Sequence, residues 1–114
     1  MSYQVSLVKD DRPVTVARHC EGAVYAIGGE TAAEITITRN YSLIYDQHNF
    51  SLRELHGKPA RLTLCELARV LAEIGTTEPH ADYWAGTPGN AGRALLILLG
   101  WAADNLDAVW DVRG

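Results

Sequence analysis

The stretch that decides the fold reads DYWAGTPGNAGR over residues 82–93 and ALLILLGWAA over residues 94–103. Its first part is rich in Gly, Pro, Asn and aromatic residues, and its second part has no polar side chain. Thr87 is suited to the N-cap of a helix, and Pro88 to the first helical position, where a missing N–H costs nothing. We therefore predict a helix from residue 88 to about residue 103 that has no polar face and is buried on nearly all sides.

A second helix is predicted over residues 63–74. Thr63 and Glu66 have the spacing of a capping box, Leu62 and Leu67 that of a hydrophobic staple, and Gly75 is suited to the C-terminal end. Its buried stripe is predicted to hold Leu64, Leu67, Ala68, Leu71 and Ile74, and its solvent side Glu66, Arg69 and Glu73. These signals come from several independent features, so the helix is firmly indicated.

Alternating patterns predict strands over residues 3–8, 14–16, 23–27, 33–41 and 108–112. In the fourth of these, Ile35, Ile37 and Tyr41 share one face, and Arg39 falls on the same face as an exception. Residues 42–55 suggest one or two helical turns under a loop. Strands followed by helices and a last strand predict a single α+β domain over residues 1–114, with a small antiparallel sheet and two main helices packed on one face.

Composition narrows the function classes. The chain has 114 residues, 47% hydrophobic and 21% charged, with a net charge of −4. This balance is that of a globular protein, and the negative charge argues against a nucleic-acid binder. Residues 1–10 lack the apolar segment of a signal peptide, and the longest apolar run is about half of the ~20 residues of a membrane span. Cys65 is predicted to be a small core residue, and a reducing, cytoplasmic location is expected.

Catalytic and metal-binding motifs are sparse. The histidines at positions 19, 48, 56 and 80 lack the spacing of a zinc site, and no nucleophile elbow, Walker loop or dinucleotide fingerprint is present. We therefore expect no catalytic residue, no metal and no cofactor. A hydrolase that uses His19 and Cys20 stays an alternative, although adjacent strand residues point to opposite faces.

The turn before the apolar helix is the candidate ligand site. A helix start offers free N–H groups to an anion, Arg93 adds charge, and aromatic side chains can stack on a planar group. The candidate residues are Tyr83, Trp84, Thr87, Asn90 and Arg93, completed by Arg39 and Asn40 at the end of a strand. We favour the simpler interpretation, in which Thr87 and Asn90 only cap the helix and the aromatic residues cover the edge of the core. Pro88 also removes one donor that an anion would use.

Interaction with a macromolecule is the other option. Tyr25, Tyr41 and Tyr45 could together form an aromatic patch for a partner. Half-buried tyrosines in sheets and loops are commoner, and we favour that simpler interpretation. A wholly apolar helix in a small domain also needs cover, which a twofold homo-oligomer would supply. The partner is expected to be a protein, a host-encoded one included, rather than a nucleic acid or a membrane.

Four segments carry a resemblance to a known family. They are AEITITRNYS at residues 33–42, LHGK at 55–58, DYWAGTPGNA at 82–91 and DAVW at 107–110. Over residues 30 to 112 the chain resembles a family of small uncharacterised phage and prophage proteins. The resemblance implies an accessory protein that acts inside a bacterial cell. The leading hypothesis is a non-enzymatic accessory protein that binds another macromolecule, and the alternative is a binder of a small anionic or nucleotide-like ligand around residues 87–93.

Overall fold

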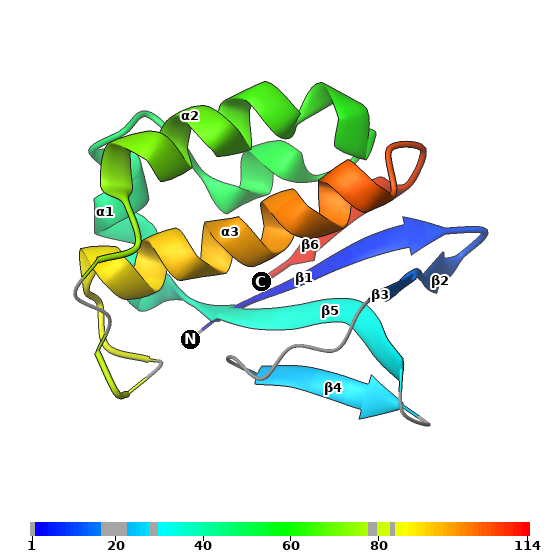
Figure 1. The fold of residues 1–114 in the computed structure, drawn as a ribbon, viewed down its shortest axis with the longest axis horizontal. Helices are drawn as coiled ribbons and strands as arrows, with labels where there is room; N and C mark the ends of the chain where they lie inside the picture. Colours follow the sequence, from blue (N-terminus) through cyan, green and yellow to red (C-terminus); the bar gives the residue numbers. More distant parts are fainter. Residues whose placement is uncertain (1, 17–22, 28–29, 78–79, 83) are drawn as a thin grey trace.

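The computed structural model describes residues 2–16, 23–27, 30–77, 80–82 and 84–114, and only the backbone of residues 23–27 and 30–31. An antiparallel sheet carries two helices on one of its faces (Figure 1), which confirms the predicted α+β class. Residues 19 and 20 and the side chain of Tyr25 lie outside this description, so the predictions made for them stay untested.

The sheet is built around its first strand. Its strands are β1 (Ser2–Lys9), β2 (Arg12–Pro13), β3 (Thr15–Val16), β4 (Ala23–Ile27), β5 (Glu30–Thr38) and β6 (Val109–Arg113). β1 pairs with β5 on one side, from Ser2↔Thr38 to Ser6↔Glu34, and with β6 on the other. β4 pairs with β5, while β2 pairs with the end of β1 and β3 with the start of β5. The strands predicted from the alternating pattern are all present, with ends shifted by up to three residues.

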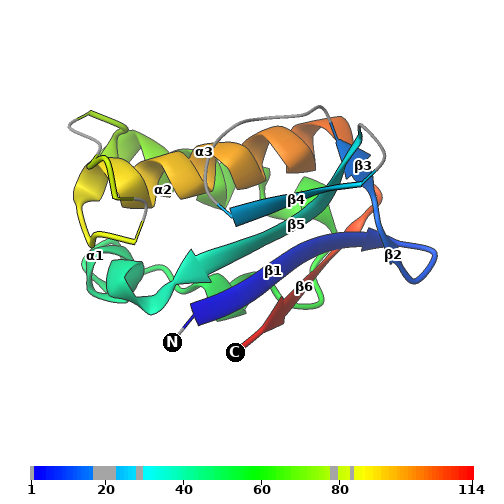
Figure 2. The same ribbon diagram turned by 90° about the horizontal axis from the view of Figure 1, so that it is seen from below.

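The helices follow in two groups. Between β5 and α2 lie the short elements η1 (Arg39–Tyr41), α1 (Ser42–Asp46), η2 (Leu52–Leu55) and η3 (Ala60–Leu62). The two main helices are α2 (Leu64–Ile74) and α3 (Pro88–Asp104). Figures 1 and 2 show α3 lying along the sheet, with α2 packed beside it. None of the described helices is long and apolar enough to span a membrane.

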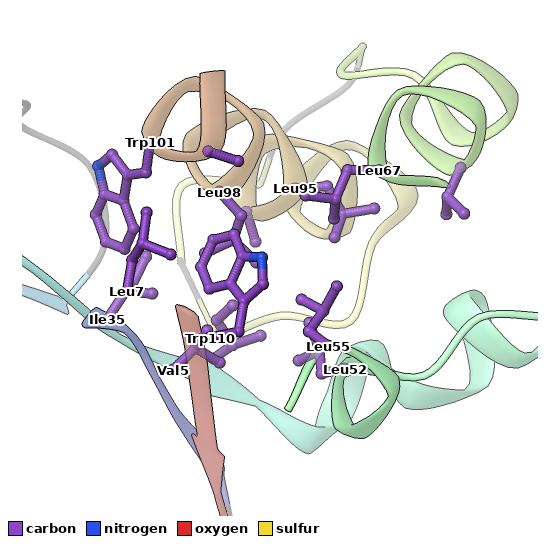
Figure 3. Packing of buried hydrophobic residues seen from close by; sticks show 14 of the residues in the cluster. Val5, Leu7, Ile35, Leu52, Leu55, Leu67, Leu95, Leu98, Trp101 and Trp110 are labelled. Carbon is purple, nitrogen blue, oxygen red and sulfur yellow. The ribbon is translucent and has the colours of Figure 1, made fainter. Parts of the chain in front are cut away.

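The core fills the space between the sheet and the helices. Figure 3 shows side chains from the strands, η2, α2 and α3 meeting in one cluster: Val5, Leu7, Ile35, Leu52, Leu55, Leu67, Leu95, Leu98, Trp101 and Trp110. Trp101 and Trp110 are 5% and 1% exposed, which confirms them as core residues. Trp110 Nε1 donates to Thr63 Oγ1 at 2.9 Å, so the polar group of its side chain is satisfied inside the core. The interior is therefore both apolar and hydrogen-bonded.

The predicted capping box at the start of α2 is wrong. Thr63 makes no capping hydrogen bond, because its hydroxyl donates to the Ala60 carbonyl oxygen and accepts from Trp110. The preceding turn η3 already gives Thr63 a helical backbone (φ −106°, ψ −6°), whereas an N-cap needs an extended one. The staple is not formed either, since Leu62 is 66% exposed while Leu67 is buried. A capping box does occur at η2, between Ser51 and Glu54.

The solvent side of α2 is as predicted. Arg69 lies 2.7 Å from carboxylate oxygens of both Glu66 and Glu73. Hydrogen bonds from His48 and from Arg69 hold the pKa of Glu73 below its usual value. On the core side, Leu64, Leu67, Leu71 and Ile74 are buried or half-buried as expected, but Ala68 and Cys65 are exposed. Cys65 is therefore a surface thiol and not a core residue.

Two further expectations need correction, and one alternative is excluded. β5 ends at Thr38, whose hydroxyl accepts from the Asn40 N–H and caps η1, so Arg39 lies outside the strand. α3 has a solvent-facing side, where Leu96 is 51% exposed and Gly100 is exposed. The reason is that the sheet and α2 cover two sides of α3 and leave the third open. Tyr41 and Tyr45 are 0% and 2% exposed, so they form no surface patch.

Candidate functional site

The predicted ligand-binding turn is organised by one buried side chain. Asn90 is 5% exposed, and its Nδ2 donates to the carbonyl oxygens of Asp82 and Ala85 at 2.8 and 3.1 Å. Its Oδ1 accepts from the His80 N–H at 3.0 Å. The Asn90 N–H in turn donates to Thr87 Oγ1 at 3.3 Å, which is the capping bond of α3. Asn90 therefore ties the loop to the helix start with every polar atom of its side chain.

The end of β5 and this turn meet by direct contact. Asn40 Nδ2 donates to the Trp84 carbonyl oxygen at 2.8 Å, and the Trp84 N–H donates to Asp82 Oδ1 at 3.0 Å. Gly86 lies so near that a Cβ there would be 2.7 Å from the Asn40 carbonyl oxygen. Burial, and then the charge of Asp82, raises the pKa of the Tyr41 phenol to about 12. The end of β5 and the turn before α3 therefore meet as predicted, but they contact each other directly and leave no space for a ligand between Asn40 and Gly86.

The remaining predicted residues contribute little to a common site. Trp84 is 41% exposed and Arg93 is half-buried. Arg39 lies with its guanidinium carbon 4.8 Å from the centroid of the Tyr3 ring, toward β1. Tyr83 lies outside the described residues. Because Thr87, Asn90 and Asn40 bond to protein groups, a ligand at the α3 start would have to displace those bonds, and this favours a structural role for the turn.

A second concave surface lies on the sheet face opposite the helices, and several of its polar side chains form no ion pair with a described residue. The register places three cross-strand rows there: Pro13–Val8–Val109, Glu34–Ser6–Asp111 and Thr36–Gln4–Arg113. They face outward because Val5 and Leu7, which alternate with them on β1, point into the core. The first row is apolar, the second acidic and the third polar.

The residues of these rows other than Thr36, together with the β1–β2 turn, line a groove of about 620 Å³. We call it the sheet-face groove, and its lining residues are Gln4, Ser6, Val8, Asp10, Asp11, Pro13, Glu34, Val109, Trp110, Asp111 and Arg113. The lining has four carboxylates against one guanidinium. Asp111 is partly neutralised, since Arg113 Nε donates to it at 3.1 Å. No described cation forms an ion pair with Asp10, Asp11 or Glu34.

The turn at one end of the groove has an unusual backbone. Asp10 and Asp11 have φ values of 55° and 64°, the left-handed region in which two-residue hairpins normally place Asn-Gly. The conformation directs two carboxylates to the rim of the groove at some cost in backbone energy. Among the described residues, no group of three or more His, Cys, Asp or Glu side chains is placed to hold a metal ion.

The sequence contained only part of the signal for this surface. The alternation over residues 3–8 and 33–38 identifies the outward side chains of β1 and β5. It does not show that β6 pairs with β1, a pairing of segments about a hundred residues apart.

In comparisons with protein-family models, curated proteins and solved structures, none matches the chain.

Proposed function

We propose that the protein is a non-enzymatic binding module that holds a segment of a partner protein in the sheet-face groove. The observation that supports this is the groove itself, an apolar row (Pro13, Val8 and Val109) with carboxylates on both sides. Asp10 and Asp11 lie in the β1–β2 turn on one side of this row, and Glu34 and Asp111 belong to the neighbouring row on its other side. A surface that is apolar in the middle and charged around it has the general anatomy of a protein interface.

The charge pattern selects the class of partner. An apolar side chain on the Val8–Val109 row, with Lys or Arg on either side of it, would complement the groove in shape and charge. Such complementarity governs the association rate and excludes acidic partners more than it adds affinity. The resemblance to phage and prophage proteins suggests that the partner is met in the bacterial cytoplasm, and a host protein is one source. A second copy of this chain is an outcome that the experiment below can recognise.

Binding can be tested with short peptides. The ¹⁵N-labelled protein is titrated with acetyl-Lys-Val-Lys-Val-Lys-amide and with the corresponding Glu peptide at low salt. The basic peptide should shift the amide signals of residues 4–8 and 109–113, and the acidic peptide should not. Glu34→Lys should weaken binding by about fivefold, because a partly exposed ion pair contributes ~1 kcal/mol. Asp104→Lys at the end of α3 makes the same charge change away from the groove and should leave binding unaltered.

The occupant can be identified by photo-crosslinking in bacterial cells. A benzoylphenylalanine residue replaces Val109, which is 38% exposed in the groove, or Leu43, which is 75% exposed on α1, as the control. A discrete adduct at position 109 alone supports the proposal, and an adduct of twice the mass of the chain identifies a second copy. Equal adducts at both positions, together with a peptide titration that shifts no groove residue, would refute it.

A further inference from the structure

The two ends of the described chain lie close together at one end of the sheet (Figures 1 and 2). Basic side chains line a concavity beside Gly114, the last residue. Arg53 of η2, His56 just after it and Arg113 at the end of β6 line a concavity of about 230 Å³ with Val112 and Gly114. No acidic side chain is among these lining residues. The concavity thus holds a local excess of cationic donors in a protein with a net charge of −4.

Arg53 makes two contacts beside the concavity. Its Nη2 donates to the Gly114 carbonyl oxygen at 2.7 Å, and its guanidinium carbon lies 5.8 Å from the centroid of the Tyr3 ring. Arg39 approaches the same ring at 4.8 Å, and its Nε is buried without an acceptor among the described residues. Two guanidinium groups thus share one aromatic ring, and neither forms an ion pair with the side chain of a described Asp or Glu. An anion nearby would offset their mutual repulsion.

His56 and Arg113 are oriented as donors. His56 Nδ1 accepts from the Val112 N–H at 3.0 Å, so in the neutral ring the proton is on Nε2, which can donate. Asp111 accepts from Arg113 Nε at 3.1 Å and also lies 3.6 Å from His56 Nδ1. The Asp111 carboxylate uses one edge of the Arg113 guanidinium and leaves its terminal amino groups for another acceptor. The cluster therefore has donors from two segments, residues 53–56 and the end of β6, and a single carboxylate side chain, that of Asp111, beside it.

We propose that Arg53, His56 and Arg113 form a binding site for a phosphate group. A planar guanidinium donates two parallel hydrogen bonds to a phosphate, and here two guanidiniums and an imidazole lie around one concavity. The volume is below the ~300 Å³ of a typical site for a drug-sized ligand, so it suits an oxyanion rather than a whole nucleotide. The site lies apart from the sheet-face groove except for the shared Arg113, and it does not depend on the function proposed for the groove.

The test uses the intact protein and inorganic phosphate. Phosphate is titrated against the ¹⁵N-labelled protein at pH 7.5, with sodium chloride at the same ionic strength as the control. Phosphate should shift the Val112 amide and the His56 ring signals to saturation, whereas chloride should not. Arg113→Gln should weaken binding at least tenfold, because one charge-assisted hydrogen bond contributes ~1.5 kcal/mol or more. Arg113 is 79% exposed, so this variant should keep its fold.

Two further variants and a phosphoserine peptide complete the experiment. Arg53→Gln should also lose at least tenfold in affinity, and its melting temperature reports separately on its contact with Gly114. Arg61→Gln removes a guanidinium of η3 that pairs with Asp107 at 3.7 Å, and phosphate binding should be unchanged. A phosphoserine peptide that binds more tightly than phosphate would identify a phosphoprotein as the source, and equal binding would indicate free phosphate. Identical shifts with phosphate and chloride, or full affinity in Arg113→Gln, would overturn the proposal.

Discussion

Gly92 and Gly100 lie in the same helix, and replacing each by Ala should change stability in opposite directions. Gly92 faces the C-terminal end of α2, where a Cβ would lie 1.7 Å from the Gly75 carbonyl oxygen and 2.8 Å from its carbonyl carbon. Observed Cβ contacts are essentially never under 3.0 Å, so α2 and α3 would have to move apart. A Cβ added at Gly100 would have no atom within 4 Å beyond the adjacent backbone of its own helix, and the residue is exposed.

The magnitudes follow from two opposing terms. Overpacking costs ~1–3 kcal/mol, and the upper end applies because the clash is with backbone; the better helix propensity of Ala returns ~1 kcal/mol. Gly92→Ala should therefore lower the free energy of unfolding by ~2 kcal/mol. For a domain of this size that corresponds to a drop of roughly 6–10 °C in melting temperature. Gly100→Ala has only the favourable term and should gain ~0.5–1 kcal/mol, or about 2–4 °C.

Urea and thermal unfolding followed by circular dichroism measure both variants against the parent protein. The m-value should stay constant if the substitutions act on the folded state alone. A Gly92→Ala protein that melts at or above the parent temperature would show that α2 and α3 do not approach as closely as the structure has them. A loss of stability in Gly100→Ala would show that this side of α3 is covered.

Three other predictions concern the turns and the core. Asp11→Gly should raise the free energy of unfolding by ~1 kcal/mol, because it removes a side chain from a left-handed backbone (φ 64°). A urea midpoint equal to that of the parent protein would argue against strain at Asp11. Asn90→Asp keeps the side-chain shape but cannot donate to the carbonyl oxygens of Asp82 and Ala85. Urea unfolding should therefore show a free energy of unfolding that is lower by ~2–4 kcal/mol. A stability equal to that of the parent protein would contradict the structural role of Asn90. Burial, and then Asp82, raises the pKa of Tyr41 from 10.0 to about 12, so the folded protein keeps a proton that the unfolded chain loses. The free energy of unfolding should therefore fall between pH 10 and pH 12 by up to ~2–3 kcal/mol, and Tyr41→Phe should remove this part of the slope.

Local patterns were sufficient to predict the elements of the fold. Alternation over residues 3–8 placed Val5 and Leu7 on a buried face, and both are fully buried. Gly75 was predicted to end a helix, and it lies after α2 with a φ of 76°. Thr87 caps α3 as expected, with its hydroxyl accepting from the Asn90 N–H. These features depend on residues close together in sequence, so they can be predicted without knowing the tertiary structure.

Tertiary contacts decided where sequence reasoning was wrong. Thr63 has the spacing of a capping residue, but its hydroxyl is bound to Trp110, which is 47 positions away. The burial of α3 was overestimated because Leu96 faces neither the sheet nor α2. The sheet-face groove depends on the pairing of β6 with β1, which no local pattern specifies. The candidate site was therefore harder to predict than the fold, because its residues come from distant segments.

The two candidate surfaces differ in what their polar groups do for the fold. Each hydrogen bond of the Asn90 side chain satisfies a main-chain group of the loop, so a ligand that took its place would leave groups unpaired at ~1–3 kcal/mol each. Glu34 and Asp10 form no ion pair with a described residue, so an incoming cation would break no ion pair of theirs within the described part of the chain. Charge substitutions in the groove should accordingly alter binding without altering stability, whereas substitutions at the start of α3 should do the reverse. This separation is the reason for assigning the proposed binding function to the sheet rather than to the helix start.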